Sequence, residues 1–184
     1  MYRKQTGITF TEVVICMSVI AVLLGLSGPS FTKFSDKRKV AAAANEISSF
    51  FENVKMESVK RNQYASITLR KDSDTGDWCM GAVLGENVSC DCMATTPECT
   101  IDSSPMLLSS SSFTEFEDVS ASFTPVTTSF DPIRGILADP SKTVTVEIEQ
   151  PSRDFKVDVS INATGSVKKC TPSDHRMVGY STCI

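Results

Sequence analysis

The sequence predicts an α+β protein in which a long N-terminal helix packs on an antiparallel β-sheet head. Three observations support this fold class. Residues 13–32 carry no charged side chain, which gives an apolar segment of membrane-spanning length. Residues 32–62 place apolar side chains three and four positions apart, the spacing of an amphipathic helix. Residues 63–184 contain short alternating segments between turns, the pattern of antiparallel strands.

Composition narrows the class of protein before any motif is considered. The chain has 184 residues, 41% hydrophobic and 22% charged, so it can form one domain or two small ones and is not wholly disordered. A net charge of −4 argues against nucleic-acid binding by bulk charge. The single histidine excludes a histidine-rich metal site, and seven cysteines predict an oxidising compartment.

Three interpretations of residues 13–32 compete: a cleaved secretory signal, a retained membrane helix and a buried core helix. Arg3 and Lys4 supply the positive flank of a signal. However, Glu12 opens the apolar segment, and a carboxylate at membrane depth costs about 2–3 kcal/mol, which disfavours an ordinary signal. A small-x-small cleavage site near Ser27–Ser30 keeps that alternative open. A core helix this apolar needs a larger protein around it.

We expect one helix over residues 8–61, bent but unbroken at Gly28–Pro29, where proline removes a helical hydrogen bond. In the head, alternating segments between turn-forming residues predict strands at 64–70, 78–84, 144–148, 155–161 and 166–170. They should form an antiparallel meander with one face on the helix and the other exposed. The serine-rich residues 98–112 are expected to form a loop, with a short strand at 106–108 as the alternative.

The start of the apolar segment contains a specific motif, Lys4-Gln5-Thr6-Gly7 followed by Ile8-Thr9-Phe10-Thr11-Glu12. Together with the apolar residues that follow, it resembles the class III signal of type IV pilins. The resemblance implies that a prepilin peptidase cuts after Gly7, that the new N-terminus at Ile8 is methylated, and that Glu12 is the glutamate of mature position five. The chain departs from the family pattern at Ile8 and Thr11.

The same resemblance divides the chain into four parts. Residues 1–7 are the prepilin leader, and residues 8–31 are the transmembrane and filament-core helix. Residues 32–62 are the amphipathic half of the helix. Residues 63–184 are the periplasmic β head, with a cysteine-rich loop and a C-terminal disulfide loop.

Cleavage after Gly7 would place a positive amine on Ile8, about one helical turn from Glu12. A carboxylate in an apolar helix is stabilised by a cation. In a helical filament, Glu12 of one subunit can therefore pair with the Ile8 amine of another, which fixes the register between subunits. The alternative is that Glu12 faces lipid headgroups near the membrane interface.

Short motifs in the head narrow the resemblance: Trp78-Cys79-x-Gly81, Cys90-Asp91-Cys92, the Phe130–Gly135 segment, and Gly165-x-Val167 followed by a cysteine pair. They resemble the minor pilin branch that contains GspH, FimT and FimU. This resemblance implies a structural subunit that primes or caps pilus assembly. It also implies a single pass through the inner membrane with a periplasmic head, and a place in the pilus after assembly.

The partners implied by this branch are other major and minor pilins, the prepilin peptidase, the inner-membrane assembly platform and membrane lipid. An H-type minor pseudopilin of type II secretion is an alternative. A DNA-binding minor pilin is another, because uptake pilins of the FimT type carry a basic motif near the C-terminus. The corresponding residues here are Lys168, Lys169 and Arg176. The acidic balance of the chain disfavours this alternative.

Cys16 lies in the apolar segment and is expected to be a reduced, small apolar residue. Six cysteines remain in the head and allow fifteen pairings: Cys79, Cys90, Cys92, Cys99, Cys170 and Cys183. Spacing favours a Cys170–Cys183 loop of about 13 residues, worth about 3 kcal/mol, with the other four paired among themselves. A zinc site on Cys90-Asp91-Cys92 is the rival, but no C-x-x-C pair and no nearby histidine supports it.

The sequence predicts no enzyme, no cofactor and no metal. Ser173-Asp174-His175 contains the residue types of a hydrolase triad, but neighbours in sequence rarely form one. No G-x-S-x-G motif is present. His175 is expected to be an exposed residue of the C-terminal tail.

Overall fold

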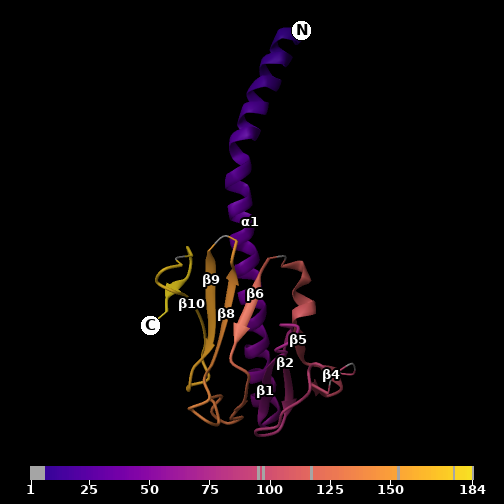
Figure 1. Ribbon diagram of the computed structural model, residues 1–184, viewed down its shortest axis with the longest axis vertical. Helices are drawn as coiled ribbons and strands as arrows, with labels where there is room; N and C mark the ends of the chain where they lie inside the picture. Colours follow the sequence, from indigo (N-terminus) through magenta and orange to yellow (C-terminus); the bar gives the residue numbers. More distant parts are fainter. Residues whose placement is uncertain are drawn as a thin grey trace, which may run out of the picture. The chain divides into compact units, whose positions relative to one another are not determined.

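The computed structural model describes residues 7–94, 96, 98–116, 118–152, 154–175 and 177–183, with the side chains of 24–31, 114 and 115 left undescribed. The chain divides into two compact units, Met1–Asp36 and Lys37–Ile184 (Figure 1). One helix, α1 (Phe10–Arg61), contributes to both units and continues through Gly28–Pro29. The helix predicted over residues 8–61 is therefore confirmed to within two residues.

The C-terminal end of α1 is closed by a Schellman motif. Asn62 follows the helix in the left-handed conformation, with φ of 51°. The amide of Asn62 donates to the carbonyl of Val59, and the amide of Gln63 donates to the carbonyl of Ser58, both at 3.2 Å. These two bonds satisfy carbonyls that would otherwise lack a partner, and they turn the chain into the first strand of the head.

Within the head, one face of α1 is buried from Val40 to Ser58. Its fully covered apolar side chains follow the predicted three- and four-residue spacing: Val40, Ala43, Ala44, Ile47, Phe51 and Val54. They join the inner side chains of the strands in one continuous core. The helix is thus the element on which the strands of the head pack.

The strands form two main sheets (Figure 1). The first has the order β5-β2-β1-β7, built from β1 (Ala65–Lys71), β2 (Trp78–Leu84), β5 (Leu107–Ser109) and β7 (Val126–Phe130). The second has the order β11-β10-β9-β8-β6, built from β6 (Ser120–Phe123), β8 (Val144–Gln150), β9 (Phe155–Ile161), β10 (Val167–Thr171) and β11 (Ser181–Thr182). A hairpin of β3 (Thr100–Ile101) and β4 (Ser104–Pro105) and a 3-10 helix, η1 (Ser110–Glu115), complete the head.

The α+β fold class and the predicted strands are confirmed, with three differences. The strands divide between two sheets instead of forming one meander, and β11 pairs with β10 in parallel. Residues 98–112 are not a loop, because they contain β3, β4, β5 and η1; the alternative of a strand near 106–108 is correct. In the first sheet, five successive residues of β1 are buried, so its second face is covered and not exposed.

Two glycines allow the β7–β8 connection and the β9–β10 turn to touch. Gly165 has φ of +67°, and a Cβ atom added there would overlap the carbonyl oxygen of Gly135, which itself has φ of +62°. The Nζ of Lys55 on α1 donates to the carbonyl of Gly165 at 2.9 Å. The helix and both connections therefore meet at the end of the second sheet where Val144 pairs with Ile161.

Gly165→Ala is expected to lower the free energy of unfolding by about 3 kcal/mol or more, because it adds steric overlap to an unfavourable φ. Gly76→Ala is the matched control, since Gly76 also has a positive φ (+78°) but nothing within 4 Å of an added Cβ. The control should lose only about 1 kcal/mol. Urea unfolding of the full chain in detergent, followed by fluorescence of the single tryptophan, measures both; equal losses would contradict the close contact at Gly165.

Candidate functional site

Glu12 forms the cap of its own helix. The amide and the hydroxyl of Thr9 both donate to Oε2 of Glu12, each at 2.9 Å. Thr9 and Glu12 are three residues apart and α1 begins at Phe10, so the pair forms a capping box. Sequence reasoning treated Glu12 as a carboxylate in need of a distant cation and missed Thr9. The T-x-x-E spacing was the signal that could have identified it.

Gly7 and Ile8, the residues of the predicted cleavage site, precede the helix and are not helical. Ile8 is 79% exposed. The leader residues Arg3 and Lys4 lie outside the described residues. Thr9, the first residue of the capping box, therefore lies between the predicted scissile bond and the first helical residue, Phe10.

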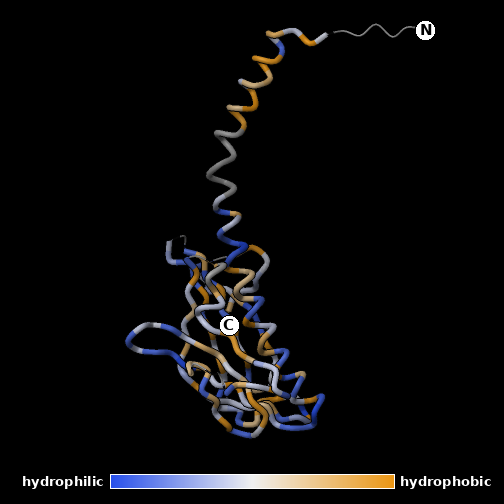
Figure 2. The backbone as a smooth tube through the Cα atoms, turned by 90° about the vertical axis from the view of Figure 1, so that its right-hand side faces the viewer, coloured by the Kyte–Doolittle hydropathy of each residue, from blue (hydrophilic) through white to orange (hydrophobic). Residues whose placement is uncertain are grey.

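The N-terminal part of α1 exposes apolar side chains on every side. Its most exposed large side chains are Phe10, Ile15, Met17, Val22 and Leu23, each more than 60% accessible. Figure 2 shows this stretch as a run of hydrophobic residues. The described side chains include no helical stretch both long and apolar enough to cross a bilayer. Residues 24–31, the remainder of the predicted membrane segment, have side chains outside the described part of the chain.

A cysteine-rich loop covers the outer face of the first sheet. This loop follows β2 and comprises residues 85–99, as far as they are described. Its main chain is held by two buried hydroxyls of β1: the amide of Val88 donates to Oγ of Ser66 at 3.1 Å, and the amide of Cys90 donates to Oγ1 of Thr68 at 3.3 Å. These bonds explain why polar side chains of β1 are buried, since the loop amides satisfy them.

All six cysteines of the head are paired. The bonds are Cys79–Cys92, Cys90–Cys99 and Cys170–Cys183. Cys79–Cys92 joins the cysteine-rich loop to β2, Cys90–Cys99 closes that loop on itself, and Cys170–Cys183 closes the C-terminal loop favoured by sequence spacing. Gly81 of β2 lies directly beneath the loop, where a Cβ would overlap Sγ of Cys99. Cys16 on the N-terminal helix is a free, exposed thiol.

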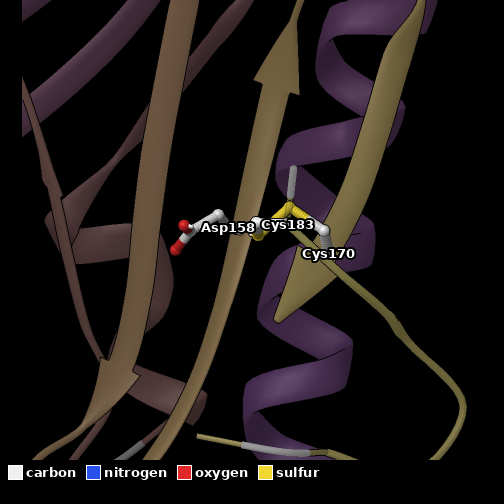
Figure 3. Close-up of side chains that lie close together, drawn as sticks. All are labelled: Asp158, Cys170 and Cys183. Carbon is white, nitrogen blue, oxygen red and sulfur yellow. Dashed lines mark hydrogen bonds between the residues drawn. A yellow bond between two sulfur atoms is a disulfide. The ribbon is translucent and has the colours of Figure 1, made fainter. Parts of the chain in front are cut away.

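The C-terminal disulfide lies beside a carboxyl group on the second sheet (Figure 3). Sγ of Cys183 is 3.6 Å from Oδ2 of Asp158, and the possible ligand atoms of Asp158, Cys170 and Cys183 lie within 4.8 Å of one another. The two sulfurs are bonded to each other, so neither is the thiolate that a metal ion requires. Burial raises the pKa of Asp158 above its ordinary range, against the opposing charge of Lys156.

The two lysines of the predicted DNA motif lie on opposite faces of β10. Lys169 faces α1, where its Nζ donates to Oδ1 of Asn45 at 2.7 Å. Lys168 is exposed on the face turned away from the helix, where it pairs in register with Ser160. The same face carries carboxylates of β8 and β9, namely Glu147, Glu149 and Asp158. Arg176 lies outside the described residues.

A helix that buries one face under disulfide-pinned antiparallel sheets, and extends N-terminally as an exposed apolar segment, defines a pilin-like protein. The chain belongs to the family described as type II transport protein GspH, whose model matches residues 43–165, more than half of the chain. This confirms the resemblance to the GspH, FimT and FimU branch of minor pilins and pseudopilins. The family and fold are those of structural pilins.

Proteins similar to this chain include a minor pilin of known structure and an uncharacterized protein. Two crystal structures of the type IV minor pilin FimU of Pseudomonas aeruginosa are 18% identical, with TM-scores of 0.48 and 0.45. They cover 78% and 74% of this chain and 99% of each FimU chain. An uncharacterized protein of Haemophilus influenzae is 22% identical over 89 residues, which is 48% of this chain and 52% of that protein. The chain thus spans about half the length of this curated relative.

We expect alkylation under denaturing, non-reducing conditions to label Cys16 and none of the six cysteines of the head, because their sulfurs are in disulfides. Prior reduction of the same sample should label all seven and serves as the control. Cleavage after Glu86, Asp91 and Glu98 places Cys79, Cys90, Cys92 and Cys99 on four separate peptides, so mass spectrometry of the linked peptides can assign both bonds. Bound zinc, or two or more labelled thiols in the head, would contradict the oxidised state.

Proposed function

We propose that this chain is a minor type IV pilin, cut after Gly7 by a prepilin peptidase and held in the inner membrane by residues 8–31 with its head in the periplasm. It then enters a filament as a structural subunit that primes or caps assembly. The observation that carries the proposal is Glu12, five residues after Gly7 and in the first turn of a helix whose N-terminal apolar side chains, up to residue 23, are exposed on every side. A bilayer, and later a filament core, would cover these side chains.

Membership of the GspH family supports this proposal, because it assigns the head to the pilin-like class independently of the N-terminal motif. The family model begins at residue 43 and so does not include the N-terminal signal. The N-terminal motif and the family match of the head are therefore independent evidence for the proposal. Further partners would be the major and minor pilins of the same filament, the assembly platform and membrane lipid.

The geometry of Glu12 suits a second partner. Both hydrogen bonds from Thr9 use Oε2, and within the described residues Oε1 accepts none. Cleavage would place a new amine on Ile8, and in a filament the Ile8 amine of a neighbouring subunit could reach Oε1. One carboxylate would then cap its own helix with one oxygen and fix the register between subunits with the other. The ion pair would offset the cost of burying both charges in the filament core.

An H-type pseudopilin of type II secretion is the second candidate, favoured by the description of the matching family. Cleavage and the role of Glu12 would be the same in that machine, and the neighbouring subunits would differ. Co-isolation of the mature chain with pilins or with pseudopilins of its own cell separates the two. DNA binding is not put forward, because Lys168 and Lys169 do not form one basic surface.

The mature chain is expected to begin at Ile8, and replacement of Gly7 by leucine should abolish processing. The peptidase would need the small residue at the bond it cuts, and only this position leaves the amine at the observed offset from Glu12. Gly28→Ala, a glycine change within the apolar segment, is the control that should be processed normally. Intact-mass measurement of membrane-extracted protein reads both, and a start near Ser30 would instead indicate an ordinary signal peptidase.

Three substitutions at Glu12 test the proposed ion pair with the neighbouring subunit's Ile8 amine. Glu12→Ala and Glu12→Gln should be processed, inserted and folded with normal disulfides, yet be poorly incorporated into filaments. The reason is the neighbour's amine, whose burial without a partner costs several kcal/mol, about 3–5 by analogy with other buried pairs. Glu12→Lys should be worse, because it adds repulsion. The measurement is a filament count with co-purification of neighbouring pilins at equal protein level.

Thr9→Ala is the matched control for these variants. It removes the hydroxyl that donates to Oε2, leaves the main-chain amide of residue 9 in place and keeps the charge. Glu12→Gln instead removes the charge and keeps an oxygen that can cap the helix. Pairing between subunits predicts near-normal filaments with Thr9→Ala and few with Glu12→Gln. The reverse result would assign Glu12 to capping alone, and normal filaments with every Glu12 variant would overturn the pairing.

A further inference from the structure

His175, the single histidine of the chain, lies between two carboxylates. Its Nε2 is 2.7 Å from Oδ1 of Asp154 in the β8–β9 turn, and its Nδ1 is 3.0 Å from Oδ1 of Asp174 in its own loop. The Nδ1 contact is ionic, because this buried nitrogen has no partner with hydrogen-bond geometry. The imidazole side chain is 24% exposed, and the side chains of Asp154 and Asp174 are 79% and 70% exposed, so the three groups meet at the surface of the head. It is not the exposed tail residue that the sequence suggested.

The arrangement is complete only when the ring is positively charged. A neutral imidazole has one N–H and one lone pair, so one of the two carboxylates would face a lone pair. Imidazolium has no lone pair on either ring nitrogen, and its positive charge attracts both carboxylates. The carboxylate of Asp174 makes the largest contribution and raises the pKa of His175 from its ordinary 6.5; the charge of Asp154 acts in the same direction, and partial burial opposes them.

The loop that carries His175 is fixed at its base. β10 and β11 pair in parallel at Cys170 and Thr171, and the Cys170–Cys183 disulfide closes the loop. The hydroxyl of Thr171 also donates to the main-chain carbonyl of His175. Further out, the loop exposes Val178, which is 92% accessible. The contact between His175 and Asp154 therefore joins the outer part of this loop to a different connection of the sheet.

The other charged groups near the ring, among the described residues, come from β8 and β9. Lys156 of β9 acts on Asp174 through its charge, but its Nζ is engaged with Oε2 of Glu147 on β8 at 2.8 Å. Asp158 of β9 is coupled to His175 by charge, and burial favours its neutral form. Asp154 and Asp174 remain the two carboxylates in direct contact with the imidazole.

We propose that His175 is a pH-operated latch: as imidazolium it binds the C-terminal loop to the β8–β9 turn, and as neutral imidazole it releases this contact. The stabilisation is fully present below the pKa of histidine in the unfolded chain, and it is lost as the pH rises through the higher pKa of the folded chain. The segment around His175 is thus held on the β8–β9 turn at mildly acidic pH, whereas at alkaline pH the disulfide, the Thr171 hydroxyl and the buried Met177 hold the loop without that contact. This inference concerns the head and does not depend on the function proposed above.

The test uses the full chain in detergent micelles. Because the chain has one histidine, NMR of the ring gives a single titration between about pH 5 and pH 9. Its midpoint is expected above 6.5. Hydrogen exchange of the amides of the C-terminal loop, divided by intrinsic rates at each pH, should show greater protection below that midpoint than above it.

Asp154→Asn removes the charge of the turn partner while keeping its shape, so it should lower the midpoint and abolish the pH-dependent part of the protection. Asp74→Asn is the matched control, since it neutralises an exposed carboxylate in the β1–β2 turn of the other sheet; it should change neither. A wild-type midpoint at or below 6.5 would overturn the latch. So would pH-dependent protection that persists unchanged in Asp154→Asn.

Discussion

Both main sheets of the head pack on the same buried face of α1, and this shared contact forms the core of the head. The sheets do not continue into each other by hydrogen bonds, and each covers its inner side chains against the same helical stripe from Val40 to Val54. Among the described residues neither sheet has another element of that length to pack on, because the further helix found there, η1, is short. The contact of Lys55 with Gly165 joins the end of this helix to the second sheet. The order of the head therefore follows from the helix, and anything that shifts α1 affects both sheets together.

Much of this fold could be predicted from the sequence, and the successes share a cause. β2 and β9 begin and end where they were expected, because turn residues flank both strands; β9 also has a clear alternation, whereas β2 is apolar almost throughout. The failures also have physical reasons. Strands of two or three residues, such as β3 and β4, are too short to show a period. Ser66 and Thr68 looked like the exposed side of β1, yet they are buried because amides of the cysteine-rich loop satisfy their hydroxyls. No local pattern in the sequence indicates that a distant loop will supply these hydrogen-bond donors.

The candidate site was predicted in part for a related reason. The spacing of Gly7 and Glu12 is local, so it could be identified without a structure. Of the two partners of His175, Asp154 is far away in the sequence, and Asp174 is the preceding residue, whose position alone does not predict a contact. His175 was therefore expected to be an exposed residue of the tail. Glu12 illustrates the complementary case, since its nearest partner, Thr9, is local and was overlooked while a distant cation was considered. A carboxylate with one oxygen engaged and one open can contribute to folding and to assembly at once.

The pairing of the cysteines has a consequence for how the head matures. Cys90 and Cys92 are separated by one residue and bond to different partners, Cys92 backwards to Cys79 and Cys90 forwards to Cys99. If the head is exported from its N-terminal side, Cys79 and Cys90 are the first two cysteines to meet an oxidant. Joining cysteines in the order of their arrival would link these two and leave Cys92 to Cys99, a set with the right number of bonds and the wrong connectivity. Oxidative folding of this protein would then require thiol–disulfide exchange by an isomerase, and not an oxidase alone.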